Sequence, residues 1–126
     1  MTMTVTPHVN APGAVISGVV LSTLSDNEWT KLYAAFLEFG VLVFPDQFLS
    51  EEGQDVFARR FGEIEQLSPY QKGASVPISN TKRDGTVAQP DEYQYQVLRG
   101  NEGWHTDSTY MPLASKAAML TAVVLP

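Results

Sequence analysis

The sequence predicts an α+β fold in which short strands alternate with two helices before a long loop leads to further strands. Two observations predict this order. A helix start signal at residue 25 is followed by apolar residues at helical spacing up to residue 39. Short apolar runs at residues 14–21 and 41–44 flank that helix, and each run has the length of a strand.

The first element along the chain is a short strand. Residues 1–11 are rich in Thr and Pro and predict a flexible N-terminal arm, in which His8 is solvated. The apolar run 14–21 predicts a strand that contains Gly18, a residue that often marks a bulge.

The clearest local signal is the helix predicted over residues 25–39. Ser25 and Glu28 have the spacing of a capping box, in which each side chain satisfies a backbone N–H of the other residue. Gly40 follows the last apolar position, where glycine commonly ends a helix. The residues spaced for one buried face are Trp29, Leu32, Tyr33, Phe36 and Leu37.

The second strand and the second helix follow directly. The run 41–44 ends at Pro45 and predicts a buried strand. Ser50 is placed to begin a helix, because a serine hydroxyl caps free N–H groups and the next two residues are acidic. Gly62 is expected to end this second helix.

The rest of the chain predicts a long loop and then strands. Residues 63–94 are interrupted by proline and glycine, with a short strand near 76–79. A loop of this length is uncommon in a compact domain unless it has a function. Alternation over 93–98 predicts a strand, and the apolar run 117–125 predicts a strand buried on both faces.

The bulk composition excludes several classes of protein. The net charge of −6 argues against a nucleic-acid partner, which requires clustered Lys and Arg. Cysteine is absent, so thiolate metal sites and disulfides are excluded. No signal peptide or membrane span is present in these 126 residues, so we expect a cytoplasmic protein with no membrane partner.

The chemistry-bearing motif is His105-Thr106-Asp107. In an extended segment, residues i and i+2 point to one face, so His105 and Asp107 could reach one ion. An imidazole and a carboxylate suit Fe(II), Mn(II) or Zn(II), and two His with one carboxylate is typical of non-haem iron oxygenases. The tripeptide alone also fits a surface turn, in which Asp107 caps Ser108 or Thr109 and His105 is solvated.

The surroundings of this motif resemble a known family. Gly103 to Tyr110 resembles the WHTD segment of the taurine dioxygenase and 2,4-dichlorophenoxyacetate dioxygenase (TauD/TfdA-like) family. The resemblance covers residues 12–126 in order. Its other matching segments are Pro12–Gly18, Phe44–Gln47, Phe57–Glu63 and Pro112–Pro126.

The resemblance implies an Fe(II)- and 2-oxoglutarate-dependent dioxygenase that uses O2 to hydroxylate a small organic acid. It implies that His105 and Asp107 are catalytic metal ligands, and that Asn101 and Tyr70 contact the substrate. Leu67 stands where taurine-type members have a His, which makes a sulfonate substrate doubtful.

Several residues near the motif also fit structural roles. Asn101 suits a turn because Asn tolerates left-handed backbone, and Tyr70 suits packing of the loop. Trp104 is expected to pack beside the site, and Glu102 is expected to be solvated or to support the site from outside.

The resemblance also implies a double-stranded β-helix (jelly-roll) fold, of which residues 12–126 form an incomplete N-terminal part. The family's third metal ligand, a His, lies far downstream of the segment that matches here. The Thr and Arg that hold 2-oxoglutarate also follow later, so no cosubstrate-binding residue is expected in this chain. We therefore expect the chain to be inactive alone, and a homo-oligomer is typical of the family.

Two other interpretations remain open at this point. The chain could be a short, non-catalytic binding module that keeps the first part of the fold and pairs its last strand with another chain. It could also be a small metal enzyme that completes its site with His8 or with a second protomer.

Overall fold

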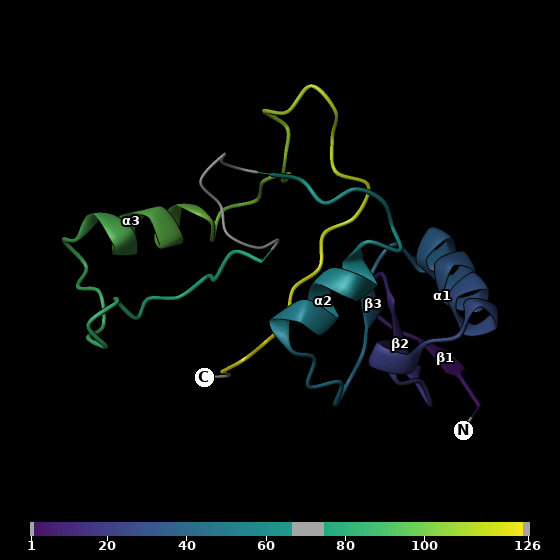
Figure 1. Cartoon of the computed structure of the whole chain (residues 1–126). Helices are drawn as coiled ribbons and strands as arrows, with labels where there is room; N and C mark the ends of the chain where they lie inside the picture. Colours follow the sequence, from purple (N-terminus) through teal and green to yellow (C-terminus); the bar gives the residue numbers. More distant parts are fainter. Residues whose placement is uncertain (1, 67–74, 125–126) are drawn as a thin grey trace. The chain divides into compact units, whose positions relative to one another are not determined.

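The computed structural model describes residues 2–66 and 75–124, and its contacts divide the chain into two units, Met1–Phe57 and Ala58–Pro126. Figure 1 labels the helices and strands along the chain. The first unit holds nearly all of the regular structure. Among the described residues, no helix combines the length and the apolar character needed to cross a bilayer. The elements are β1 (Thr4–Pro7), β2 (Ala14–Ser17), the 3-10 turn η1 (Leu21–Thr23), α1 (Asp26–Phe39), β3 (Leu42–Val43), α2 (Glu51–Ala58) and α3 (Tyr93–Gly100).

The three strands form one sheet in the order β1-β2-β3. Strands β1 and β2 pair antiparallel, and β2 and β3 pair in parallel. Residues 4–7 therefore form a strand, where the sequence suggested a flexible arm. The Thr-Val-Thr of β1 has high strand propensity, and β2 offers it a free edge for pairing. His8 is exposed, as expected, and its backbone N–H donates to Gly13 O.

The predicted strand 14–21 ends early, at Ser17, because Gly18 has a φ of +71°. The side-chain amide of Gln47 then holds the chain that follows. Its Oε1 accepts from the Leu21 N–H at 2.9 Å, and its Nε2 donates to Val19 O at 3.3 Å. The side chain of Gln47 thus satisfies two backbone hydrogen-bonding groups between β2 and η1.

Helix α1 confirms the predicted cap and the predicted end, but Leu37, which was expected on the buried face, is 69% exposed. Ser25 caps it, and the capping box with Glu28 is present in both directions. Gly40 ends it with a φ of +72°, and its N–H donates to Phe36 O. On the inner face Leu32 is fully buried, and α1 packs against β3, the neighbour of β2 in the sheet. Ile16 of β2 is also fully buried.

Helix α2 is also confirmed, with the Ser50 hydroxyl accepting from the Gly53 N–H at 3.1 Å, although the helix ends at Ala58 and not at Gly62. Its Phe57 is buried and lies edge-on to Trp29 and Phe44, with ring centroids 6.2 and 6.0 Å away. The run 41–44 contributes only the two-residue β3, and the expectation that this run is buried is wrong for Val41 and Val43. Strand β3 lies at the edge of the sheet, so it has a neighbouring strand on one side only, and the side chains of Val41 and Val43 are exposed.

The described part of residues 63–92 in the second unit is loop, as predicted, but the short strand near 76–79 does not form. A single bridge pairs Thr81 with Val87 around a turn whose Gly85 has a φ of +84°. Asp84 accepts from both the N–H and the hydroxyl of Thr86, which closes the turn.

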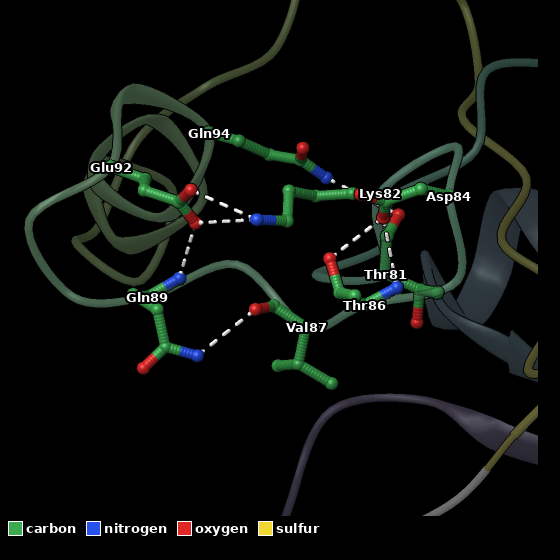
Figure 2. A network of polar contacts seen from close by, with 8 residues as sticks. All are labelled: Thr81, Lys82, Asp84, Thr86, Val87, Gln89, Glu92 and Gln94. Carbon is green, nitrogen blue, oxygen red and sulfur yellow. Dashed lines mark hydrogen bonds and ion pairs between the residues drawn. The ribbon is translucent and has the colours of Figure 1, made fainter.

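A polar network ties this turn to the start of α3. Figure 2 shows Lys82 reaching the Glu92 carboxylate, with its Nζ 2.9 Å from Oε1. The other Glu92 oxygen accepts from the Gln89 N–H at 2.6 Å. The Gln94 amide of α3 donates to Ser79 O at 2.9 Å. Local hydrogen bonds, with little apolar packing, therefore hold α3 on this loop.

Two strand predictions in the second unit are wrong. Residues 93–98 form part of α3, and the half-buried positions Gln94, Tyr95 and Leu98 have helical spacing. Residues 117–124 form no strand, and Leu120, Val123 and Val124 are more than 80% exposed. A strand needs a hydrogen-bonded neighbour, and the described residues of this unit contain none.

Candidate metal centre

The predicted pair His105 and Asp107 lies in an irregular segment between α3 and a turn that begins at Asp107. The Nε2 atom of His105 is 3.1 Å from the Oδ1 atom of Asp107. Their side chains are 50% and 67% exposed. The two candidate donor atoms therefore face each other and are accessible to an ion from solvent.

The backbone just before the pair orients the imidazole. His105 Nδ1 lies 2.8 Å from Gly103 O, so an N–H at Nδ1 donates to that carbonyl. This bond, followed by the charge of Asp107, raises the pKa of His105. In the neutral imidazole, a proton held at Nδ1 leaves the lone pair on Nε2, which is the usual arrangement of a metal-binding histidine.

The separation of the two donor atoms fits one metal ion. Neighbouring ligands of an octahedral ion with bonds of about 2.1 Å lie about 3 Å apart. The observed 3.1 Å matches this spacing, and it is equally the length of an ion pair between a protonated His105 and Asp107. No cluster of three or more potential ligands occurs within residues 2–66 and 75–124, so the described chain offers a pair of donors.

The outcomes differ among the other residues that the sequence singled out. Asn101 is exposed at the end of α3 with a φ of −78°, so a left-handed turn does not explain it. Tyr70 and Leu67 lie outside the described residues. Trp104 is fully exposed, so the expectation that it packs beside the site is wrong in this structure. Glu102 is exposed, as its solvated interpretation requires.

Sequence reasoning missed a group of side chains next to the pair. Ser108 follows Asp107 directly, is buried, and has a φ of +60°. The Ser108 hydroxyl donates to Glu65 Oε2, and the Ser115 hydroxyl lies 2.6 Å from the same oxygen. Nothing in the sequence marks these residues, because Glu65 is 43 positions before Ser108 and serine does not signal left-handed backbone.

Comparison with known proteins identifies the family. The sequence profile of the taurine catabolism dioxygenase TauD, TfdA family matches residues 4–126. The chain belongs to this family. The family match begins within β1, three residues from the start of the chain, and runs through both units, so it includes the His105 and Asp107 pair.

Two relatives in the TauD, TfdA family are (S)-phenoxypropionate/alpha-ketoglutarate-dioxygenases. The protein from Sphingobium herbicidovorans is 47% identical over 90% of this chain and 38% of its own length. The protein from Delftia acidovorans is 44% identical over 99% of this chain and 43% of its own length. The chain therefore spans about two fifths of the length of these relatives.

A solved structure supports the same relationship. The crystal structure of AAD-2 in complex with Mn(II) and N-oxalylglycine superposes with a TM-score of 0.77 at 29% sequence identity. The superposition covers 90% of this chain and 39% of that protein. A putative alpha-ketoglutarate-dependent taurine dioxygenase from Burkholderia xenovorans matches 55% of this chain with a TM-score of 0.50.

Proposed function

We propose that this chain is the N-terminal part of an Fe(II)- and 2-oxoglutarate-dependent dioxygenase that hydroxylates a small organic acid. In this proposal His105 and Asp107 are two of the three protein ligands of the iron. The observation that carries it is the 3.1 Å separation of His105 Nε2 and Asp107 Oδ1, with the imidazole anchored through Nδ1 to Gly103 O.

The ligands in the related crystal structure support this choice of metal and cosubstrate. AAD-2 was crystallised with Mn(II), which prefers the same nitrogen and oxygen donors as Fe(II). N-Oxalylglycine has the skeleton of 2-oxoglutarate with one methylene replaced by NH. The two curated relatives are named for alpha-ketoglutarate, a synonym of 2-oxoglutarate.

The chemical roles of the residues follow from their contacts. Fe(II) with 2-oxoglutarate and O2, when bound, supplies the oxidation that converts a substrate C–H to C–OH. His105 offers a neutral nitrogen, since the Gly103 carbonyl favours the proton on Nδ1. Asp107 offers a negative charge at short range, which favours a divalent cation between the two side chains.

The substrate class is proposed from the relatives and from one residue. (S)-Phenoxypropionate carries an aromatic ether beside a carboxylate, and two relatives are named for it. Leu67 replaces a polar His of taurine-type members, which favours a substrate with an apolar part over a sulfonate. We place Asn101 and Tyr70 among the substrate contacts.

The complete fold is proposed to be the jelly roll of this family. The described sheet has three strands. We assign it to the flank that precedes the jelly-roll core. The core strands, the third iron ligand and the residues that hold 2-oxoglutarate would come from sequence downstream of residue 126. We therefore propose that these 126 residues alone do not catalyse hydroxylation.

Metal binding tests the proposal without requiring activity. Mn(II) is titrated into the chain, and free Mn(II) is counted by electron paramagnetic resonance. His105→Ala should weaken binding strongly, because it removes one of two donors. His8→Ala is the matched control, since His8 is exposed and distant in sequence from the pair, and it should bind as the wild type does.

The outcomes separate the competing functions. Equal binding by the wild type and His105→Ala would overturn the iron site and favour a non-catalytic module. A loss caused by His8→Ala would instead indicate a site completed by that residue. The proposal stands if only the His105 variant loses affinity.

A further inference from the structure

The Glu65 carboxylate joins two segments that are distant from it in sequence and close to the metal pair. Its Oε2 accepts from the hydroxyls of Ser108 and Ser115, at 2.5 and 2.6 Å. The two hydroxyls also lie 2.9 Å from each other. One carboxylate oxygen therefore fixes both ends of the segment that begins immediately after Asp107.

Ser108 needs such a partner for two reasons. Its φ of +60° is a left-handed conformation that residues with a Cβ rarely adopt unless their surroundings hold them there. Its side chain is also buried, and a buried hydroxyl without a partner is unfavourable. The bond to Glu65 meets both needs, and the conformation of Ser108 sets the direction of the Asp107 that precedes it.

The charge state and surroundings of Glu65 fit this role. The hydrogen bonds from Ser108 and then Ser115 lower the pKa of Glu65, so the group stays ionised and accepts both bonds. Its Oε1 is buried and has no hydrogen-bond partner among the described residues. A glutamine would keep one oxygen toward the serines, and its NH2 would take the place of Oε1, which has no hydrogen bond to lose among the described residues.

We propose that Glu65 is a positioning residue of the metal centre, which acts through Ser108 to hold Asp107 beside His105. This inference rests on the proposed function, since it assumes that His105 and Asp107 bind the metal. It assigns a role to a residue that contributes no donor atom to the pair. Partners of this kind, outside the ligand set, orient ligands and commonly govern metal affinity.

The test compares Mn(II) affinity among variants of the full chain, by the same paramagnetic resonance titration. Glu65→Leu keeps the bulk and removes the acceptor, and it should lower affinity by roughly 10–100-fold, the usual effect of losing an outer-shell partner. Glu65→Gln should stay close to the wild type. Glu63→Leu is the matched control, because Glu63 is exposed two positions away, and it should leave affinity unchanged.

A second substitution tests the route through Ser108. Glycine adopts a φ of +60° without help and carries no hydroxyl to satisfy. In a Ser108→Gly background, adding Glu65→Leu should therefore change Mn(II) affinity by less than about twofold, far below the usual outer-shell effect. General unfolding caused by Glu65→Leu would not be rescued in this way, so the double variant separates positioning from loss of structure.

The outcomes distinguish this inference from the function on which it rests. If His105→Ala weakens Mn(II) binding and Glu65→Leu binds as Glu63→Leu does, the positioning role is wrong and the metal site stands. If Glu65→Leu still causes its full loss of Mn(II) affinity in the Ser108→Gly background, then Glu65 does not act through Ser108. If His105→Ala has no effect, the proposed function and this inference both fall.

Discussion

The Nε2 atom of His105 lies 3.1 Å from the Oδ1 atom of Asp107, across a single intervening residue. This spacing suits two neighbouring ligands of one divalent ion. Both side chains are at least half exposed, so solvent competes for them. A pair of donors in this setting should bind metal weakly, and the residues that orient the pair should have a measurable effect on that binding.

Removing the charge of Asp107 should lower metal affinity although the shape of the side chain is kept. Asp107→Asn retains an oxygen near His105 Nε2 but loses the negative charge that attracts a cation. We expect a loss of at least about tenfold in Mn(II) affinity, since removing an outer-shell partner already costs this much. Asp91→Asn, at an exposed position before α3, should change nothing. Equal affinities of the two variants would show that Asp107 is not a ligand.

The proximity of His105 and Asp107 was predictable from sequence because its geometry is local. Residues two apart in a non-helical segment can share a face, and that alone brings His105 to Asp107. Glu65 was not predictable, because its bond to Ser108 spans 43 positions and depends on a backbone conformation that serine does not announce. Local spacing thus identified the candidate donors, whereas the contacts that support them depend on the tertiary structure.

The capping box of α1 predicts a dependence of stability on pH. Hydrogen bonds from Ser25 hold the pKa of Glu28 below its ordinary value of 4.5. A group with a lowered folded pKa stabilises the fold above its unfolded pKa, and this contribution disappears as the pH falls through the folded value. The stabilisation by Glu28 should therefore be complete above pH 4.5 and be lost below it.

Urea unfolding followed by circular dichroism checks this dependence. The wild type should be more stable than Glu28→Gln at about pH 7, and the gap should shrink at about pH 3. Glu38→Gln is the control on the same helix, since Glu38 is exposed at the other end and lies outside the cap. A difference in stability between the wild type and Glu28→Gln that does not change with pH would contradict the role of the Glu28 charge.

The fold was predictable where the signal was complete within one segment. Helix α1 carries its own cap and its own end signal, and both appear in the structure. Of its predicted apolar face, Leu32 is fully buried but Leu37 is exposed. The segment 93–98 has alternating Tyr and Gln that suggest a strand, but Gln and Leu also favour helices, and α3 forms. The run 117–124 has strand composition without a neighbouring strand in the described unit, and composition alone does not form a sheet.

Two leucines of α1 should differ sharply in their contribution to stability. Leu32 is fully buried, whereas Leu37 is 69% exposed. Leu32→Ala should cost about 2–5 kcal/mol of unfolding free energy through lost burial and a cavity. Leu37→Ala, which makes the same change in helix propensity, should stay within about 0.5 kcal/mol. Similar costs measured by urea unfolding would mean that α1 does not bury this face in solution.

Two glycines of the first unit share one backbone conformation and differ in their surroundings. Gly18 and Gly40 have φ values of +71° and +72°. A Cβ on Gly18 would lie 2.3 Å from the backbone oxygen of Thr2, while a Cβ on Gly40 would meet nothing within 4 Å. Alanine at either position carries the cost of left-handed backbone, but only alanine at 18 also collides with the chain that leads into β1.

The difference in unfolding free energy between Gly18→Ala and Gly40→Ala therefore measures the effect of the close approach between Gly18 and the residues before β1. Gly40→Ala should cost about 1–2 kcal/mol, the usual penalty of a left-handed residue with a Cβ. Gly18→Ala should cost about 1–3 kcal/mol more, because backbone must move to relieve the overlap. Urea unfolding of both variants gives the comparison. Equal costs would show that the residues before β1 shift away freely, and that β1 contributes less to the sheet than its four-residue pairing with β2 implies.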